Sequence, residues 1–377
     1  MIKRLIDAQI ESKLFKNKAI IIVGARQIGK TTSINFVLKN KEKVLFLDGD
    51  DPVVRELLDN ANTEQIRNLI GDKTFIFIDE AQRIQNIGLT AKIIVDQFKN
   101  VQLIISGSSA FDLKNSLSES LTGRKWEYQM FPVTWHELEE TYGYLKSLQQ
   151  LELRILYGMY PEIITNNGDE KERLKLLIDS YLYKDILSFY NIQKPWVLQN
   201  LLKALALQMG NEISLNELAN LLQVDKNTVK NYIEILEKSF VIFTLSGFNR
   251  NIRNELKQAK KVFFWDNGIR NAVIGNFSPL ELREDKGALW ENFLIAERMK
   301  KNNYENPYIN SYFWRTTTQL EIDYVEEIEG EIFAYQIKWN ENTKIKSFEN
   351  FRETYKTDVV KIHPKNFREF LVNKNEK

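Results

Sequence analysis

A glycine-rich stretch, GARQIGKTT, runs from Gly24 to Thr32 and directly follows the apolar residues 19–23. Its spacing is G-x-x-x-x-G-K-T, which is typical of a loop between a strand and a helix whose backbone N–H groups surround phosphates. In such a loop the lysine, here Lys30, reaches the β and γ phosphates, and the hydroxyl of Thr31 binds Mg²⁺. The stretch therefore predicts a triphosphate site formed by the whole loop: Gly24, Ala25, Arg26, Gln27, Ile28, Gly29, Lys30, Thr31 and Thr32.

A second apolar segment, residues 74–78, ends in two neighbouring acids, Asp79 and Glu80. After a phosphate-binding loop, this pair predicts that Asp79 binds Mg²⁺, directly or through water, and that Glu80 orients and deprotonates the attacking water. The alternative is a buried strand that ends in a solvated turn. Residues 43–48 (KVLFLD) add a strand between the two motifs. This extra strand and the adjacent glutamate favour ATPases that carry their own catalytic base, so we predict that the chain binds ATP with Mg²⁺ and hydrolyses it to ADP and phosphate.

Two further positions are candidates for contact with the γ-phosphate. The fourth apolar segment ends in SGSS, where ATPases of this branch place a polar side chain that senses the γ-phosphate, so Ser108 or Ser109 is the candidate. The alternative for these serines is a helix N-cap. Arg124 lies between the fourth and fifth expected strands, where AAA proteins place an arginine that acts on the nucleotide of a neighbouring subunit. The alternative for Arg124 is a surface residue after a helix-capping glycine.

The elements that must position these residues alternate in type along the first third of the chain. Apolar runs predict five strands with helical patterns between them: residues 19–23, 43–48, 74–79, 101–106 and 126–131. Such alternation predicts a parallel sheet covered by helices, with the site at the carboxyl ends of the strands. A short amphipathic helix is expected within residues 1–17. From His136 to about Phe189 the pattern is helical, which predicts the small lid expected in AAA-type ATPases.

A helix-turn-helix pattern follows the ATPase segment. A capping box at Ser214–Glu217 begins a short helix, and Asp225 caps a second helix with apolar residues at helical spacing. Two strands, residues 240–245 and 261–265, then complete a winged helix. Its second helix and wing carry candidate contacts to DNA or RNA: Lys226, Asn227, Lys230, Arg250 and Arg253. The alternative is a winged helix that packs against protein and exposes a solvated, lysine-bearing face.

The last third of the chain predicts a helix, three strands, a helix and a strand. This order, with Asp323 on the second strand and Gln336-x-Lys338 on the third, resembles the core of PD-(D/E)xK nucleases. In those enzymes carboxylates bind Mg²⁺ and the lysine helps to activate water. The resemblance implies a candidate second metal site: Glu291, Asp323 and Gln336 with Lys338. Gln336 stands where an acid is usual, which weakens metal affinity, and the alternative is a nuclease-like fold that only packs or regulates.

The composition is that of an ordinary globular protein of 377 residues, 43% of them hydrophobic and 27% charged. Because the formal net charge is only +1, any contact with nucleic acid must be local. The absence of cysteine excludes disulfides, thiolate metal sites and cysteine catalysis, and two distant histidines disfavour a histidine metal site. No apolar run approaches the length of a membrane span, so we expect a cytoplasmic protein that contacts no membrane.

Taken together, the motifs resemble a large prokaryotic family of AAA-type ATPases with a C-terminal domain of unknown function. The resemblance also rests on stretches outside the nucleotide motifs: Leu121–Arg124, Tyr183–Ile186, Trp265–Arg270 and Leu289–Asn292. It implies an α/β fold with four parts. These are a P-loop (AAA-like) ATPase core with a parallel sheet, a helical lid, a winged helix-turn-helix and a restriction-endonuclease-like α/β domain, at residues 1–135, 136–195, 196–268 and 269–377.

Three hypotheses for the function remain open. In the leading one, the nucleotide state of a Mg²⁺-dependent ATPase controls a winged-helix and nuclease-like half that acts on nucleic acid. In the second, the chain is a signalling or defence switch, similar to STAND ATPases, that binds protein partners. In the third it is an ATP-regulated nuclease. A homo-oligomer would give Arg124 a role between subunits.

Overall fold

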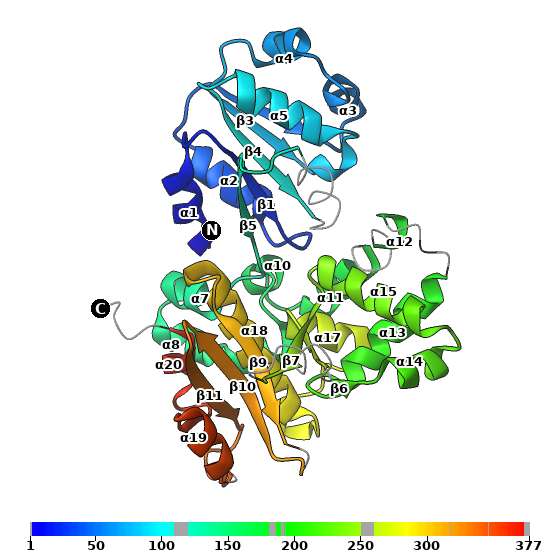
Figure 1. The fold of residues 1–377 in the computed structure, drawn as a ribbon, viewed down its shortest axis with the longest axis vertical. Coiled ribbons are helices and arrows are strands. Elements are labelled where there is room, and N and C mark those ends of the chain that lie inside the picture. The colour runs from blue at the N-terminus through cyan, green and yellow to red at the C-terminus, as the bar shows by residue number, and fades with distance from the viewer. Residues whose placement is uncertain are drawn as a thin grey trace. The chain divides into compact units, whose positions relative to one another are not determined.

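The structure is a computed structural model, and it describes residues 2–108, 120–180, 186–189, 192, 194–249, 260–316, 318–345 and 347–372. The chain forms two compact units. Unit 1 consists of Met1–Pro132 and Lys238–Phe240, and unit 2 consists of Val133–Glu237 and Val241–Lys377. Each unit contains its own β-sheet (Figure 1).

Unit 1 contains a five-stranded sheet in the order β2-β3-β4-β1-β5, and all its neighbouring strands are parallel. The strands are β1 (Ala19–Val23), β2 (Val44–Asp48), β3 (Phe75–Asp79), β4 (Gln102–Gly107) and β5 (Lys125–Gln129). Every residue of β1, β3 and β4 is buried, so both faces of the sheet are covered. The predicted parallel α/β sheet is therefore confirmed, because its apolar runs are the strands of a sheet with two buried faces.

The helices of unit 1 pack in pairs, α1 on α2 and α4 on α5. Their bounds are α1 (Leu5–Lys13), α2 (Lys30–Leu38), α3 (Pro52–Leu58), α4 (Thr63–Ile70) and α5 (Ile87–Gln97), with a 3₁₀ turn η1 (Ala81–Arg83). The helix expected within residues 1–17 is α1, which buries Ile6 and Ile10 and ends before Leu14. Because β1, β3 and β4 are parallel and adjacent, their carboxyl ends meet at one edge, which is where the loop before α2 and the acid pair lie.

Unit 2 begins with a series of short helices. They are α7 (Trp135–Tyr142), α8 (Tyr144–Gln149), α9 (Leu151–Tyr157), α10 (Pro161–Thr165), α11 (Glu170–Leu177) and α12 (Ile186–Phe189). Helix α9 packs on α17 (Asn267–Ile274), where the amide of Asn267 donates to the carbonyl of Ile155 (3.0 Å) and that of Asn271 donates to the carbonyl of Leu156 (2.8 Å). The helices expected to form a lid on the ATPase core are thus grouped with the C-terminal half of the chain, and in α9 buried amides 112 and 115 residues away satisfy two of the carbonyls.

The middle of unit 2 contains two capped helices between short strands. The elements are α13 (Pro195–Leu207), β6 (Glu212–Ile213), α14 (Leu215–Leu222), α15 (Lys226–Lys238), β7 (Ile242–Gly247) and β8 (Lys260–Phe264). The predicted caps are present: the Ser214 hydroxyl accepts from the Glu217 N–H (3.3 Å), and Asp225 accepts from two N–H groups at the start of α15. Strand β8 pairs antiparallel with both β7 and β6.

The C-terminal part of unit 2 continues the same sheet, whose order is β12-β11-β10-β9-β7-β8-β6. The added strands are β9 (Asn310–Arg315), β10 (Glu321–Ile328), β11 (Glu331–Ile337) and β12 (Val359–Ile362). Strands β9, β10 and β11 are antiparallel, whereas β12 is parallel to β11 and β9 is parallel to β7. The expected boundary near residue 268 therefore divides a sheet that is continuous through the β7–β9 pairing.

Three helices and a 3₁₀ turn complete unit 2: α18 (Lys286–Glu305), α19 (Glu349–Tyr355), α20 (Phe367–Leu371) and η3 (Leu280–Leu282). The long helix α18 lies against the sheet (Figure 1), and its Asn292 amide exchanges hydrogen bonds with the backbone of Phe264 on β8. Within the described part of the chain, no helix combines the length and the apolar character needed to cross a bilayer.

Candidate functional site

The glycine-rich loop is held in its path by close packing. Gly24 has no room for a side chain, because a Cβ there would lie 2.2 Å from the carbonyl oxygen of Met130. Gly29 has φ 93° and precedes α2, a left-handed conformation that favours glycine. Two buried backbone oxygens are also tied to the buried guanidinium of Arg4, which donates to the carbonyls of Ile28 (2.7 Å) and Phe131 (2.6 Å). Arg4 is a part of this site that no local motif marked.

Lys30 begins α2 and turns back over the loop. Its ammonium donates to the carbonyl of Gly24 at 2.9 Å and to that of Ala25 at 2.8 Å. Burial lowers the pKa of Lys30 to about 8, although the carboxylates of Glu80 and Asp79 oppose this shift. The side chain is thus a desolvated cation whose present acceptors are two neutral carbonyls. A phosphate oxygen would be a stronger, charged acceptor for it.

Asp79, at the carboxyl end of β3, contacts both α2 and β4. Its Oδ2 accepts from the hydroxyl of Thr31 at 2.5 Å, and its Oδ1 accepts from the hydroxyl of Ser106. Register explains this meeting, because Ile78 on β3 lies opposite Ile105 on β4, which places Asp79 beside Ser106. The carboxylate and the Thr31 hydroxyl are oxygen donors of the kind Mg²⁺ prefers, and they already lie together. The residues present therefore fit a Mg²⁺ ion bound with the phosphates.

Glu80 follows Asp79 in a left-handed backbone conformation. Its φ and ψ are 47° and 38°, a left-handed backbone that is unusual for a non-glycine residue and that is found at functional sites. The side chain accepts from the amide of Gln82 at 2.5 Å and lies 3.7 Å from the guanidinium of Arg26. The same Gln82 amide donates to the hydroxyl of Ser108 at 2.9 Å. Gln82 thus connects the candidate base with the candidate sensor.

Gln82 and Ser106 are residues that the sequence reasoning did not assign. Both stand in stretches that motifs had marked, DEAQ and SGSS. The sequence did contain a signal for Gln82. This polar residue follows Glu80 by two positions, so it must lie close to the nucleotide site in any order of the strands. Ser109, the other candidate sensor, lies outside the described residues.

Arg124 is engaged within its own chain. Its Nε donates to a carboxylate oxygen of Asp96 on α5 at 2.7 Å, and its side chain is 42% exposed. An exposed pair of this kind contributes little stability and can be exchanged for another partner. The contact is compatible with either prediction for Arg124.

In unit 2 the structure brings together the four residues of the candidate second metal site. Asp323 lies in β10 where the register with β9 shifts, between Ile322 and Val325. Its Oδ1 accepts from the Gln336 amide at 3.0 Å, and its Oδ2 accepts from the ammonium of Lys338 at 3.2 Å and from the Ile337 N–H at 2.7 Å. Glu291 on α18 completes the group, since Asp323 and Lys338 both act on its pKa.

Two residues that the sequence analysis did not assign belong to the same group. They are Lys261 on β8, whose ammonium lies 2.5 Å from a carboxylate oxygen of Glu321, and Glu321 itself on β10. We call the six residues the acidic cluster: Lys261, Glu291, Glu321, Asp323, Gln336 and Lys338. Burial and the charge of Asp323 raise the pKa of Glu291 to about 8, and burial raises that of Asp323. Among the described residues, no group of three or more His, Cys, Asp or Glu side chains is arranged to hold a metal ion.

The predicted nucleic-acid contacts on α15 are exposed. Lys226, Asn227 and Lys230 face solvent, whereas Val229 and Ile233 of the same helix are buried. The other predicted contacts, Arg250 and Arg253, lie outside the described residues, as do Tyr183, Lys184 and Asp185 of the resemblance motifs.

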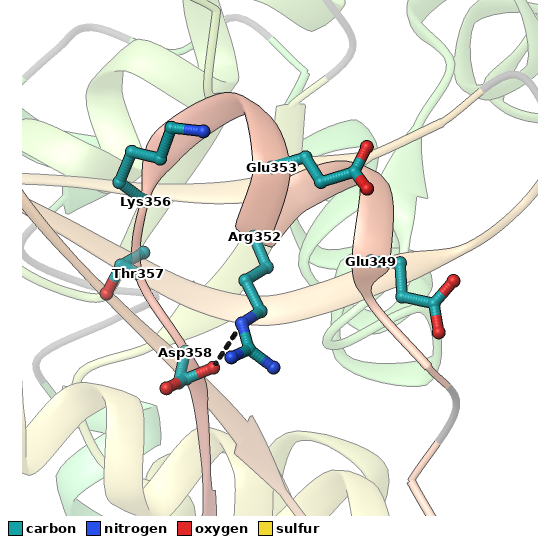
Figure 2. A pocket seen from close by; sticks show the side chains of 6 residues that line it. All are labelled: Glu349, Arg352, Glu353, Lys356, Thr357 and Asp358. Atoms are coloured by element: carbon teal, nitrogen blue, oxygen red, sulfur yellow. Dashed lines mark ion pairs between the residues drawn. The ribbon is translucent and has the colours of Figure 1, made fainter.

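A surface pocket of about 460 Å³ opens beside α19 (Figure 2). Its lining combines acidic, basic and hydroxyl side chains: Glu349, Arg352, Glu353, Lys356, Thr357 and Asp358. The Arg352–Asp358 ion pair across it spans 3.2 Å, but the side chains are 70% and 77% exposed, so solvent screens it. The pocket includes none of the predicted site residues.

Comparisons with known proteins agree with the geometry of unit 1. Residues 16–139 match the family model described as "AAA domain". Residues 16–139 are thus similar to this family, and we call them the AAA domain below. The Walker-type ATPase PABY2304 of Pyrococcus abyssi has a similar structure, with a TM-score of 0.51 at 15% identity, over 72% of this chain and 96% of that one. At that identity the likeness shows the P-loop ATPase fold alone.

Two further segments of the chain match families without an assigned function. Residues 148–280 and 286–377 match two models described as "Domain of unknown function", DUF8612 and DUF4143. An uncharacterized protein of Methanocaldococcus jannaschii, MJ1544, is 26% identical over 95% of this chain and 84% of its own length. Another of Mycobacterium tuberculosis, Rv2008c, is 27% identical over 88% of this chain and 72% of its own length. The similarity to these two proteins thus extends beyond residues 16–139 into the segments that follow.

Proposed function

We propose that the AAA domain is a Mg²⁺-dependent ATPase that hydrolyses ATP to ADP and phosphate. The observation that carries the proposal is the convergence of a desolvated lysine, a threonine–aspartate pair and an oriented glutamate at one edge of the sheet. Lys30 is held over the loop, Thr31 touches Asp79, and Glu80 is held by Gln82. These are the groups that phosphoryl transfer to water requires.

Each group has a distinct task in this reaction. The loop N–H groups and Lys30 bind the β and γ phosphates, where Lys30 offsets negative charge. Thr31 and Asp79 would hold Mg²⁺, which neutralises charge on the phosphate oxygens when it is bound. Glu80 accepts a proton from the attacking water, and Ser108, linked to it through Gln82, is placed to sense the γ-phosphate.

Two variants test the chemistry. Lys30→Ala should weaken ATP binding, because it removes the charge that faces the phosphates. Glu80→Gln should bind ATP normally and hydrolyse it at least about 100-fold more slowly, in line with the loss of a general base. Phosphate release and binding of a fluorescent ATP analogue measure the two effects. Wild-type hydrolysis by both variants would refute the mechanism.

We further propose that residues 196–268 are a winged helix that contacts nucleic acid. The support is the element order α13-β6-α14-α15-β7-β8, with antiparallel pairing of β8 to its two neighbours, and the exposed face of α15. Exchange of Lys226 and Lys230 for alanine should weaken duplex DNA binding and reduce its salt dependence. Lys203→Ala, an exposed lysine on α13, is the matched control. If the chain does not bind duplex DNA even at low salt, the alternative of a signalling or defence switch that binds protein partners would be favoured.

Control of this half by nucleotide is the second step of the proposal. ATP binding would favour one state of the AAA domain, and hydrolysis would release it. Duplex DNA affinity should therefore differ between the Glu80→Gln variant with ATP and the same variant with ADP. Equal affinities would remove the coupling but leave the ATPase intact. If a homo-oligomer forms, ATPase activity per chain should rise with protein concentration, and Arg124→Ala should abolish that rise.

We also propose that residues 269–377 have a nuclease-like fold. The support is the order α18-β9-β10-β11-α19-β12, with three antiparallel strands and a fourth that is parallel to the third. A third candidate function, ATP-regulated cleavage of nucleic acid, would use Asp323 and Lys338 of the acidic cluster. Cleavage of plasmid or single-stranded DNA with Mg²⁺ or Mn²⁺, lost in Asp323→Ala, would support it.

A further inference from the structure

A lysine from outside the nuclease-like segment enters the acidic cluster. Lys261 lies on β8, within the part that matches DUF8612, whereas Glu291, Glu321 and Asp323 lie in the part that matches DUF4143. Its side chain is only 3% exposed, and its ammonium lies 2.5 Å from Glu321 and 4.0 Å from Glu291. A lysine rarely takes so buried a position unless it is paired. The sheet explains its arrival, because β7 joins β8 to β9 and β10.

Two of the three carboxylates of the cluster already have an ammonium partner. Lys261 lies 2.5 Å from Glu321, and Lys338 lies 3.2 Å from Asp323. Lys261 also lies 4.0 Å from Glu291, the third carboxylate. A divalent cation would therefore have to enter a cluster that already holds two fixed positive charges.

The oxygen atoms of the cluster differ in whether they have hydrogen-bond partners. Both oxygens of Asp323 accept hydrogen bonds, Oδ1 from Gln336 and Oδ2 from Ile337 and Lys338. By contrast, Oε1 of Glu291 and Oε1 of Gln336 are buried without a hydrogen-bond partner. Gln336 itself is 6% exposed. Buried oxygens without partners are costly, so these two are acceptors that a cation in the cluster would satisfy.

We propose that Lys261 is a tethered cation that holds the place of a divalent metal ion in the acidic cluster, so that unit 2 excludes Mg²⁺ and Mn²⁺ until this side chain is withdrawn. The inference rests on the nuclease-like fold proposed above. It also defines a means of control: β8 carries the lysine, so a movement of β8 that withdraws Lys261 from Glu321 would leave the oxygens of Glu291 and Gln336 open to another cation. The same movement would involve the strands that flank α14 and α15.

Removal of the lysine charge tests the proposal directly. Mn²⁺ binding to the nucleotide-free full chain is measured by the loss of the free-ion EPR signal, in an Asp79→Asn background that removes the carboxylate of the AAA site. The Lys261→Met variant keeps the length and apolar stem of the side chain. It should gain one Mn²⁺ site that binds at least about tenfold more tightly than any in the parent, because one positive charge a few ångströms from the ligands is gone. Asp323→Asn added to it should remove that site.

Two controls separate charge from disturbance of the fold. Lys261→Arg keeps the positive charge and should gain no Mn²⁺ site, and Lys260→Met changes the exposed neighbour on the same strand. Mn²⁺ binding by Lys261→Met that is no tighter than in the parent would overturn the proposal. If Lys261→Met does not fold, the parent itself decides: equal Mn²⁺ binding with and without Asp323→Asn supports the tethered cation, and weaker binding after Asp323→Asn refutes it.

The outcome is independent of ATP hydrolysis. Phosphate release by the chain with Asp79 intact tests the AAA domain alone, whereas Mn²⁺ uptake in the Asp79→Asn background tests unit 2 alone. An active ATPase with no gained Mn²⁺ site would refute only the tethered cation. An inactive ATPase with a gained site would refute only the proposed hydrolysis.

Discussion

The role of Gln82 offers a sharp test of the candidate site, because it connects two catalytic candidates. Gln82→Leu keeps the approximate size of the side chain in η1 but removes the amide that donates to Glu80 (2.5 Å) and to Ser108 (2.9 Å). A hydrogen bond to a charged group contributes about 1.5–3 kcal/mol. Arg26, 3.7 Å from Glu80, still restrains the carboxylate, so we take the lower part of that range.

A loss of about 1.4–2 kcal/mol in the transition state corresponds to a fall in kcat of about 10- to 30-fold. The KM for ATP should change less than about threefold, because the hydrogen bonds of Gln82 go to Glu80 and Ser108 rather than to the phosphate-binding loop. Steady-state phosphate release at saturating ATP gives kcat, and binding of a fluorescent ATP analogue checks that the loop is intact.

Gln85→Leu is the matched control, since this exposed glutamine lies just beyond η1. It should leave kcat unchanged. An unchanged kcat in Gln82→Leu, with normal folding and ATP binding, would refute the role of this hydrogen bond. A higher kcat would show that Gln82 restrains Glu80 instead of orienting it.

Three further predictions follow from the structure. Gly24→Ala should destabilise the AAA domain by about 1–3 kcal/mol, because the new Cβ would clash with the Met130 carbonyl. Gly287→Ala is the control and should not be destabilising, because the space around Gly287 is open. Thermal unfolding compares the two variants. Burial alone would raise the pKa of Asp285, but hydrogen bonds from two arginines lower it to about 2. The contribution of Asp285 to stability is therefore complete above its usual pKa of 3.8 and is lost as the pH falls towards 2. In denaturant unfolding, Asp285→Asn should lower the free energy of unfolding by about 1–2 kcal/mol at pH 7 and leave it unchanged at pH 2. The control Glu284→Gln should change the free energy of unfolding at neither pH. Chelation of Mg²⁺ with EDTA should abolish phosphate release without changing the melting temperature of the nucleotide-free chain, and persistent hydrolysis would argue against a Mg²⁺-bound phosphate.

The sequence predicted best where the chemistry is local. The loop from Gly24 to Thr32 and the pair Asp79–Glu80 are read from consecutive residues, and the apolar runs before them locate β1 and β3 to within about a residue. The caps at Ser214 and Asp225 were also predictable, because each cap bonds only to residues two or three positions away. Interactions this short in sequence are decided by residue type and spacing.

The grouping of helices was not predictable in this way. The helices after residue 135 were expected to form a lid, yet two carbonyls of α9 accept hydrogen bonds from Asn267 and Asn271, more than 100 residues later. Likewise, the sheet of unit 2 includes strands from both sides of the boundary expected near residue 268. Amphipathic patterns show that a face will be buried but not which partner buries it.

The sequence by itself determined the identity of the phosphate-binding loop, the acid pair and the strands that lead into them. Only the tertiary structure decided which distant side chains join the nucleotide site: Arg4 contacts the loop and Ser106 contacts Asp79. It also decided that Lys261 lies in the acidic cluster of unit 2. The physical reason is that strand order in a sheet is set by the burial of both faces and by the pairing of backbone groups, and neither is written in the local spacing of residues. Residues far apart in the chain become neighbours only when that order is established.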